Sequence, residues 1–306
     1  MSYFAGRIDA HQHFFDPARF HYPWMTGSEA SLARRWGPEE LRPALRATGV
    51  TGTVAVQACH DEAETRWLLE LCEAEPAVRG VVGWVDLTRL DVGDRLSSLR
   101  TGRGGQHLVG IRHQVHDEAD PAFLGRHDVR RGIEAVLGAG LTFDLLVRSR
   151  EMPAAVDVAR AFPEGRFVLD HLGKPPTRSG DTGRWLQGLK DLASCPNVVA
   201  KISGLVTEAD RERWTPIDVL LPAQVAVELF GPERLMVGSD WPVCTLAGSY
   251  EEVVTVISVL VDGWSADERQ SVWSGTARRV YCLADPLLHP GSGGAAQKWF
   301  EQGGLV

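Results

Sequence analysis

The sequence has few cysteines, and none of them form a Cys-x-x-Cys pair. Its five cysteines are an odd number and are scattered along 306 residues, without the spacing of a zinc site or a disulfide framework. We interpret them as small buried residues in a reducing compartment. They are Cys59, Cys72, Cys195, Cys244 and Cys282.

Long apolar runs and an excess of positive charge are also missing. No run is long enough to span a bilayer, and no basic-then-apolar leader precedes the first expected strand. We therefore expect a cytoplasmic protein. The net charge of −8 argues against nucleic acid or an anionic membrane as a partner.

Several common active-site motifs are absent as well. Gly238-Ser-Asp240 lacks the second glycine of a Gly-x-Ser-x-Gly nucleophile elbow, which argues against a serine hydrolase. There is no dinucleotide-binding fingerprint and no phosphate-binding Walker loop, and the glycines at 102–105 fit a flexible connection better.

Strand and helix patterns alternate along most of the chain. With 44% hydrophobic and 24% charged residues, the chain can bury a large core. Eight short β-rich runs, each followed by a helical pattern, predict a single-domain (β/α)8 barrel over residues 1–284, with a glycine-rich tail at 285–306. The expected strands are Arg7–Ala10, Thr53–Gln57, Gly80–Val85, Leu108–His113, Leu141–Val147, Arg166–Asp170, Asn197–Ile202 and Arg234–Gly238.

Helix boundary residues mark the segments between these strands. Glycines or prolines close several of them, Pro222 is expected to kink or shorten one, and Ser265 with Glu268 forms a capping-box pattern that opens a last helix. Residues 21–36 are expected to form a long aromatic-rich connection. The expected helices are Pro38–Ala47, Asp61–Glu75, Val92–Leu99, Val129–Ala139, Pro153–Ala161, Thr182–Leu192, Ile217–Phe230 and Ser249–Leu260.

The carboxyl ends of the expected strands are rich in His, Asp and Arg. In a strand, residues i and i+2 point to the same face, so His11 and His13 are expected to project together. In barrels of this kind, chemistry takes place at these ends. The other polar groups there are Gln57, Asp86, Arg112, His113, Arg148, Asp170, His171, Lys201, Ser203 and Asp240.

The chain resembles the amidohydrolase superfamily, and within it the sugar-lactonase branch of L-fuconolactonases and L-rhamnonolactonases. The His-x-His of the first strand is a weak motif by itself, but together with the His-Leu-Gly-Lys-Pro and Gly-Ser-Asp-Trp-Pro segments it is specific. The matching segments are Ile8–Asp16, Tyr22–Trp24, Gly83–Leu87, Gly110–Asp117, Phe143–Arg148, Val168–Pro175, Lys201–Leu205 and Gly238–Pro242.

One departure from the superfamily pattern concerns the metal. The fourth strand has Arg112 and His113 where a bridging Lys or Glu is usual, and the fifth has no histidine, so we expect no two-metal site. A single zinc ion held by His11, His13, His171 and Asp240 and a metal-free site both stay open. We expect one weakly held, dispensable ion at most.

The resemblance implies hydrolysis of a sugar lactone such as L-fuconolactone. Asp240 would act as general base, and His11, His13, His171 and Arg112 would stabilise the oxyanion. Substrate contacts are expected from Trp24, Gln57, Asp86, His113, Arg148, Lys174 and Trp241.

Three alternatives stay open. The first is a lactonase for carboxylated lactones of the pyrone-dicarboxylate or muconolactone type, and the second is a zinc-dependent decarboxylase. The third is a non-catalytic barrel that binds a sugar. The last is disfavoured by the intact set of His and Asp residues. The expected partner is a small sugar lactone, and the sequence leaves the oligomeric state open.

Overall fold

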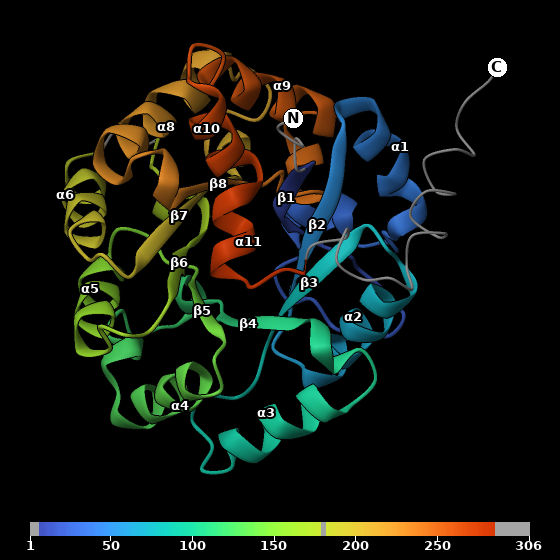
Figure 1. The fold of residues 1–306 in the computed structure, drawn as a ribbon, viewed down its shortest axis with the longest axis vertical. Coiled ribbons are helices and arrows are strands. Elements are labelled where there is room, and N and C mark those ends of the chain that lie inside the picture. Colours follow the sequence, from blue (N-terminus) through green and yellow to red (C-terminus); the bar gives the residue numbers. More distant parts are fainter. Residues whose placement is uncertain (1–5, 179–181, 285–306) are drawn as a thin grey trace.

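Eight parallel strands follow one another around a nearly closed barrel, with helices on its outer side (Figure 1). The structure, a computed structural model, describes residues 6–178 and 182–284, so the tail predicted at 285–306 lies outside the described residues. Within them the single (β/α)8 barrel is confirmed. Its strands are β1 (Arg7–Gln12), β2 (Val50–Val56), β3 (Val78–Gly83), β4 (Leu108–His113), β5 (Thr142–Leu145), β6 (Phe167–Leu169), β7 (Val198–Ile202) and β8 (Leu235–Val237).

The barrel closes where β8 meets β1. The N–H of Asp240 donates to the carbonyl of His11 at 2.8 Å, and the N–H of His13 donates to the carbonyl of Trp241 at 2.6 Å. The carboxylate of Asp9 joins the same two segments, because it accepts the N–H of Ser239 at 2.9 Å and its hydroxyl at 2.6 Å. The seam that closes the fold therefore places the first and last candidate site residues side by side.

The helices alternate with the strands as predicted, with boundaries that differ by a few residues. α8 continues past Pro222, so the expected shortening there is wrong. The Ser265 capping box opens the last helical segment, which is divided into α10, a π-helical turn at Ser271–Gly275, and α11. The helices are α1 (Pro38–Thr48), α2 (Glu62–Ala74), α3 (Val92–Thr101), α4 (His127–Gly138), α5 (Met152–Ala161), α6 (Thr182–Ala193), α7 (Leu205–Glu208), α8 (Pro216–Phe230), α9 (Tyr250–Leu260), α10 (Ala266–Gln270) and α11 (Thr276–Val280).

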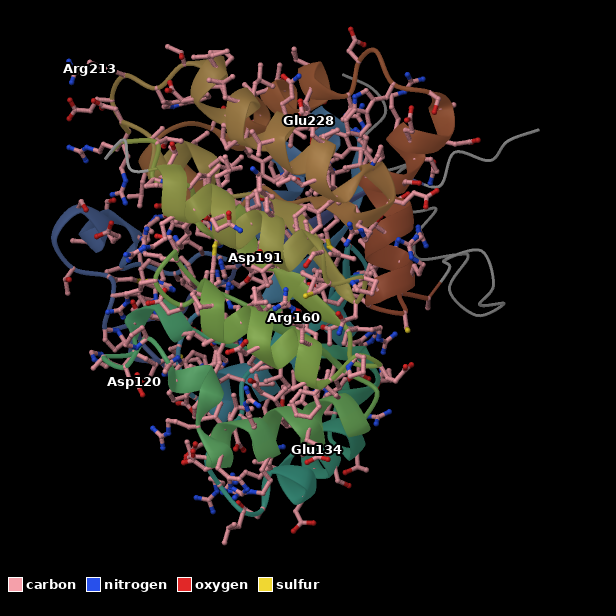
Figure 2. The ribbon with its side chains drawn as sticks, turned by 90° about the vertical axis from the view of Figure 1, so that its left-hand side faces the viewer. Asp120, Glu134, Arg160, Asp191, Arg213 and Glu228 are labelled. Atoms are coloured by element: carbon pink, nitrogen blue, oxygen red, sulfur yellow. The ribbon has the colours of Figure 1, made fainter. Side chains whose placement is uncertain are left out.

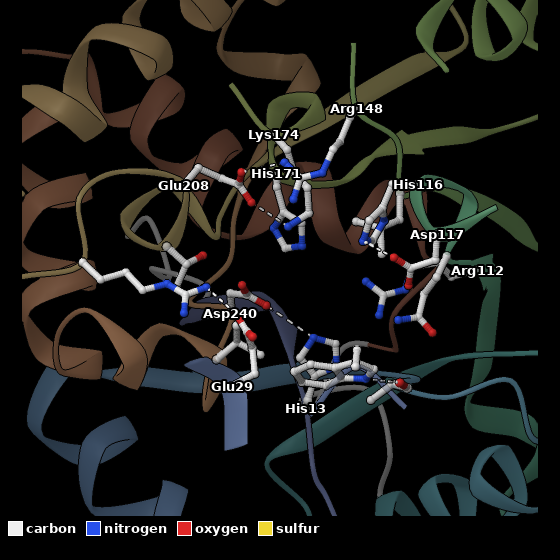
Figure 3. A pocket seen from close by; sticks show the side chains of 17 residues that line it. His13, Glu29, Arg112, His116, Asp117, Arg148, His171, Lys174, Glu208 and Asp240 are labelled. Carbon is white, nitrogen blue, oxygen red and sulfur yellow. Dashed lines mark hydrogen bonds and ion pairs between the residues drawn. The ribbon is translucent and has the colours of Figure 1, made fainter. Parts of the chain in front are cut away.

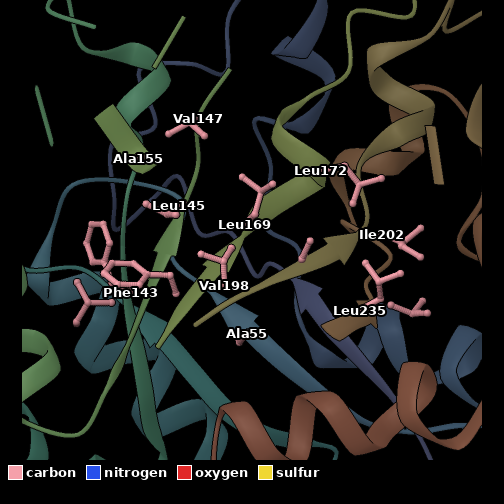
Figure 4. Packing of buried hydrophobic residues seen from close by; sticks show 14 of the residues in the cluster. Ala55, Phe143, Leu145, Val147, Ala155, Leu169, Leu172, Val198, Ile202 and Leu235 are labelled. Atoms are coloured by element: carbon pink, nitrogen blue, oxygen red, sulfur yellow. The ribbon is translucent and has the colours of Figure 1, made fainter. Parts of the chain in front are cut away.

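The core has an outer layer between strands and helices and a smaller one inside the barrel. Figure 4 shows part of the outer layer, where Phe143, Leu169 and Ile202 pack among neighbouring apolar side chains. Charged side chains such as Glu134 and Arg160 lie on the opposite, solvent-facing side of the helices (Figure 2). This amphipathic pattern is what fixes each helix onto the barrel.

α11 covers the end of the barrel where the strands begin. Val280 and Tyr281 pack with Ile8 and other inward-facing strand residues, and the Thr276 hydroxyl donates to the carbonyl of Glu233, just before β8. The carboxyl ends of the strands lie at the opposite end of the barrel and remain available for a site.

Two expectations about the chain as a whole can be compared with the structure. Four of the five cysteines are buried, but Cys282 is exposed, so the interpretation that all five are buried is wrong for this one, which follows α11. No helix in 6–178 or 182–284 is long and apolar enough to cross a membrane.

The closing seam gives the first prediction, which concerns Gly238. A β-carbon at this position would lie 2.6 Å from Cβ of His11, so Gly238→Ala forces β8 and β1 apart. We expect the free energy of unfolding to fall by about 1–3 kcal/mol in urea titrations. Gly93→Ala near the start of α3, where nothing lies within 4 Å of the added carbon, serves as the control and should be neutral or stabilising. Equal stability of the two variants would contradict the close approach.

Candidate active site

Two histidines and one aspartate meet where β1 and β8 end. The Nε2 atoms of His11 and His13 are 3.2 Å apart, and Oδ1 of Asp240 lies 3.3 Å from Nε2 of His13 and 3.7 Å from Nε2 of His11. All three side chains are almost fully buried. His13 and Asp240 point toward one another on the floor of a cavity (Figure 3).

His171 lies beside this group, on the turn after β6. Its ring centroid is 4.5 Å from that of His11, and its Nδ1 is 2.8 Å from the hydroxyl of Ser203. The backbone of both His171 (φ 54°) and Asp240 (φ 59°) is left-handed, a costly conformation for residues other than glycine. Gly204 packs so closely that a β-carbon there would lie 2.5 Å from Nδ1 of His171. Tertiary packing therefore holds these side chains in place.

A buried ionic network lies beneath the group. The ammonium of Lys201 on β7 lies 2.8 Å from Asp144 and 2.9 Å from Asp170, and all three side chains are inaccessible to solvent. Asp170 also pairs with Arg112 at 2.9 Å, while the Tyr281 hydroxyl donates to Asp144 at 2.5 Å. Burial alone would raise the pKa of Asp170, but Lys201 and His11 outweigh it and hold that pKa well below its usual range. For Asp144, burial prevails over Lys201 and raises the pKa.

Burial also sets the protonation of the histidines above this network. It lowers the pKa of His11 and of His171 well below the usual value, so both rings are neutral at neutral pH. Burial alone would raise the pKa of Asp240, but the interactions with His171 and His13 outweigh burial. The pKa of this carboxyl is therefore lowered, and the group is ionised. The floor of the cavity therefore presents imidazole nitrogens and one carboxylate.

This donor set fits a divalent metal ion. Nδ1 of His13 lies 2.7 Å from the carbonyl of Val56, which can only accept, so Nδ1 carries the proton and the Nε2 lone pair is free. Nε2 of His11 lies 3.3 Å from the guanidinium of Arg112, and its Nδ1 faces both the carboxylate of Asp170 and the ammonium of Lys201. The tautomer that donates from Nδ1 to Asp170 presents a lone pair at Nε2. With that tautomer, two lone pairs lie 3.2 Å apart and can bind one cation together, and neutral imidazole with carboxylate is a common ligand set for zinc.

The four ligands predicted from the sequence do not all fall into one group. His11, His13 and Asp240 do, with donor atoms within 4.8 Å of one another, whereas His171 groups with His11 and Asp170. The reason is that the turn after β6 directs Nδ1 of His171 toward Ser203.

A cavity of about 290 Å³ opens above the group, at the small end of the ~300–1,000 Å³ range of ligand pockets. Seven of the predicted site residues line it, namely His13, Trp24, Arg112, Arg148, His171, Lys174 and Asp240. His11 lies just below, at the bottom of the group.

The other four predicted substrate contacts lie outside the cavity lining. Gln57 is buried and donates to the backbone carbonyl of Arg112, while its Oε1 accepts from the Arg112 guanidinium at 3.4 Å and so helps to position that group. Asp86 accepts the N–H and hydroxyl of Thr88 in the turn after β3. His113 stacks on His60 and Phe123, and Trp241 packs against Phe14 and Trp36. Each side chain is held by neighbours that a sequence pattern does not show.

Sequence reasoning missed the charged residues at the rim. Glu208 comes from α7, Arg211 from the loop after it, and Glu29 from the connection after β1, and none of them lies at a strand end. They lie in loops or in helical turns too short to give a periodic pattern by which to find them. The other missed lining residues are Ala58, Gln114, His116, Asp117, Leu146, Thr207 and Val243.

A (β/α)8 barrel with a His-x-His strand and a closing aspartate at its carboxyl end defines an amidohydrolase-type site. The amidohydrolase family model matches residues 8–283, and the chain belongs to this family, which confirms the resemblance.

Two curated relatives and one solved structure are similar along most of their length. An L-fucono-1,5-lactonase from Burkholderia multivorans is 40% identical over 92% of this chain and 97% of its own length. Another, from Burkholderia ambifaria, is 38% identical over 80% of this chain and 83% of its own length. The crystal structure of a Burkholderia multivorans amidohydrolase with bound zinc superposes with a TM-score of 0.85 at 40% identity, over 92% of this chain and all of that one.

The buried network gives the second prediction, which concerns Lys201. Lys201→Met leaves Asp144 and Asp170 without their shared cation, so we expect the free energy of unfolding to fall by about 3–5 kcal/mol in urea titrations. Lys190→Met on the exposed side of α6 is the control and should change it by less than about 0.5 kcal/mol. If the two variants are equally stable, the network does not hold the barrel together.

Proposed function

We propose that the protein hydrolyses a sugar lactone, L-fucono-1,5-lactone or a close stereoisomer, to the aldonic acid. The observation that carries this proposal is a charge-balanced cavity placed directly over the His11, His13 and Asp240 group. The names of the two Burkholderia lactonases agree with it. The chain is thus a hydrolase that acts on a cyclic ester. We also propose that the protein is located in the cytoplasm.

Asp240 takes the role of general base. Its ionised carboxylate accepts a proton from water while the water oxygen attacks the lactone carbonyl carbon. The resulting tetrahedral intermediate collapses when the ring C–O bond breaks, and the proton held by Asp240 passes to the ring oxygen. One proton is taken and returned, so the carboxylate is regenerated.

Arg112 and His171, which line the cavity, are the groups we assign to stabilise the negative charge that develops on the carbonyl oxygen. A well-placed donor of this kind contributes roughly 3–4 kcal/mol to the stabilisation of the transition state. Arg112 is held by Asp170 and by the carbonyl of Gln57, so its guanidinium is fixed before the substrate binds.

A divalent ion of the zinc type would be held by His11, His13 and Asp240. When bound, it polarises the carbonyl and lowers the pKa of water. Arg112 already brings a fixed positive charge within 3.3 Å of Nε2 of His11 and takes over part of this work.

The charges in the cavity favour a neutral substrate over a carboxylated one. Among the described residues, four cationic and four acidic side chains line the cavity. Glu208 pairs with Arg148 and with Lys174, and Glu29 pairs with Arg211, so each of these three cations already has a carboxylate partner. Their remaining N–H groups suit hydroxyls. No comparable observation favours a pyrone-dicarboxylate, a muconolactone or a decarboxylation substrate.

The proposed function is tested by proton release on addition of L-fucono-1,5-lactone, with Asp240→Asn beside the wild type. The substitution keeps the shape but removes the basicity, so turnover should fall by roughly two or more orders of magnitude while circular dichroism stays unchanged. Near-normal turnover in folded Asp240→Asn would rule out this base. Thermal stabilisation by the lactone without acid formation would show a binder instead of an enzyme.

Metal removal gives a further prediction. We expect one weakly held divalent ion at most per chain, and substantial lactonase activity after exhaustive chelation, because Arg112 and His171 remain as oxyanion donors. Metal analysis and rates before and after chelation decide this, with His13→Ala as a control that should not hold the ion. Complete loss of activity, restored by one equivalent of zinc, would show that the ion is essential.

A further inference from the structure

Glu208 is the acidic residue around which the cationic side of the cavity is arranged. Its Oε1 accepts from the ammonium of Lys174 at 2.7 Å, and its Oε2 accepts from the guanidinium of Arg148 at 2.9 Å. These partners come from the turn after β6 and from the end of β5, so the carboxylate joins three neighbouring segments. Figure 3 shows Glu208 beside Lys174 and His171 at the edge of the cavity.

The position of this carboxylate is fixed by its own segment. Gly204, the residue just before α7, packs directly on His171 and Asp240. At the other end of α7, the carbonyl of Glu208 accepts from the Thr177 hydroxyl at 2.9 Å. The carboxylate is therefore held at a set place relative to the reacting group.

Glu208 is ionised in this position. Burial alone would raise its pKa, but Lys174 and Arg148 outweigh burial and lower it. Only 11% of its side chain is exposed, so solvent screens this charge weakly. One negative charge thus offsets two cations that both line the cavity.

We propose that Glu208 determines the substrate class, because it occupies the two cations that a carboxylated lactone would need. This inference rests on the proposed lactonase function. A substrate carboxylate near Lys174 and Arg148 would compete with Glu208 for both and would be repelled by it. Hydroxyl groups need only the unused N–H groups of the same side chains and are accepted.

The test compares two lactones on Glu208→Gln and the wild type. One is L-fucono-1,5-lactone, and the other is an aldaric acid lactone of the same ring size, in which a carboxylate replaces the exocyclic methyl group. We expect the ratio of kcat/KM for the two to shift toward the carboxylated lactone by about tenfold or more. Added salt should lower the gain on the carboxylated lactone and leave the neutral one unchanged.

Two further variants serve as controls. Glu208→Asp keeps the charge and should keep the preference of the wild type. Asp210→Asn changes the net charge equally on the same segment, but Asp210 lies outside the cavity lining and pairs with Arg213, so the ratio should not move. An equal loss of activity of Glu208→Gln on both lactones, without salt dependence, would overturn the proposal and leave Glu208 a structural role.

A binding measurement separates this inference from the proposed function. The open-chain aldarate dianion is titrated calorimetrically into the wild type and Glu208→Gln, and we expect the variant to bind it about tenfold more tightly or better. If the wild type hydrolyses neither lactone, the proposed function fails and this titration still decides the role of Glu208. Equal affinities would overturn it.

Discussion

The rest of this structure depends on the ion pairs that the buried ammonium of Lys201 makes. This ammonium pairs with two carboxylates, Asp144 on β5 and Asp170 just after β6, where all three side chains are inaccessible to solvent. Because an uncompensated buried charge costs several kcal/mol, the three side chains have one stable arrangement. That arrangement sets the position of His11, whose Nδ1 lies 3.2 Å from Lys201 and 3.3 Å from Asp170.

The same arrangement links stability with chemistry. At the bottom of the network, the hydroxyl of Tyr281, just beyond α11, donates to Asp144. At the top, Arg112 pairs with Asp170, and its guanidinium lines the cavity. A charge that the proposed reaction uses is therefore held by contacts that also hold the barrel. The seam between β8 and β1 adds the carboxylate of Asp240, so the first and the last strand of the barrel meet at the same group of side chains.

Above this floor the cavity is balanced in charge, and the balance distinguishes it from a general anion site. A basic cavity would bind carboxylates of many shapes, but here Glu208 and Glu29 pair with three of the cations. The floor of the cavity comes from strand ends and its rim from helix ends and loops, so the rim can vary without disturbing the His11, His13 and Asp240 group.

The sequence by itself determined the barrel and the central residues of the site. The period of apolar residues depends only on neighbours along the chain, and strand ends converge in any such barrel, so His11, His13 and Asp240 could be identified in advance. Tertiary structure alone decided which polar side chains face the cavity. Gln57 is held by Arg112, and His113 is held between the rings of His60 and Phe123. Glu208 joins from a short helix whose place depends on the close packing of Gly204. Such contacts lie far apart in sequence, and no local pattern records them.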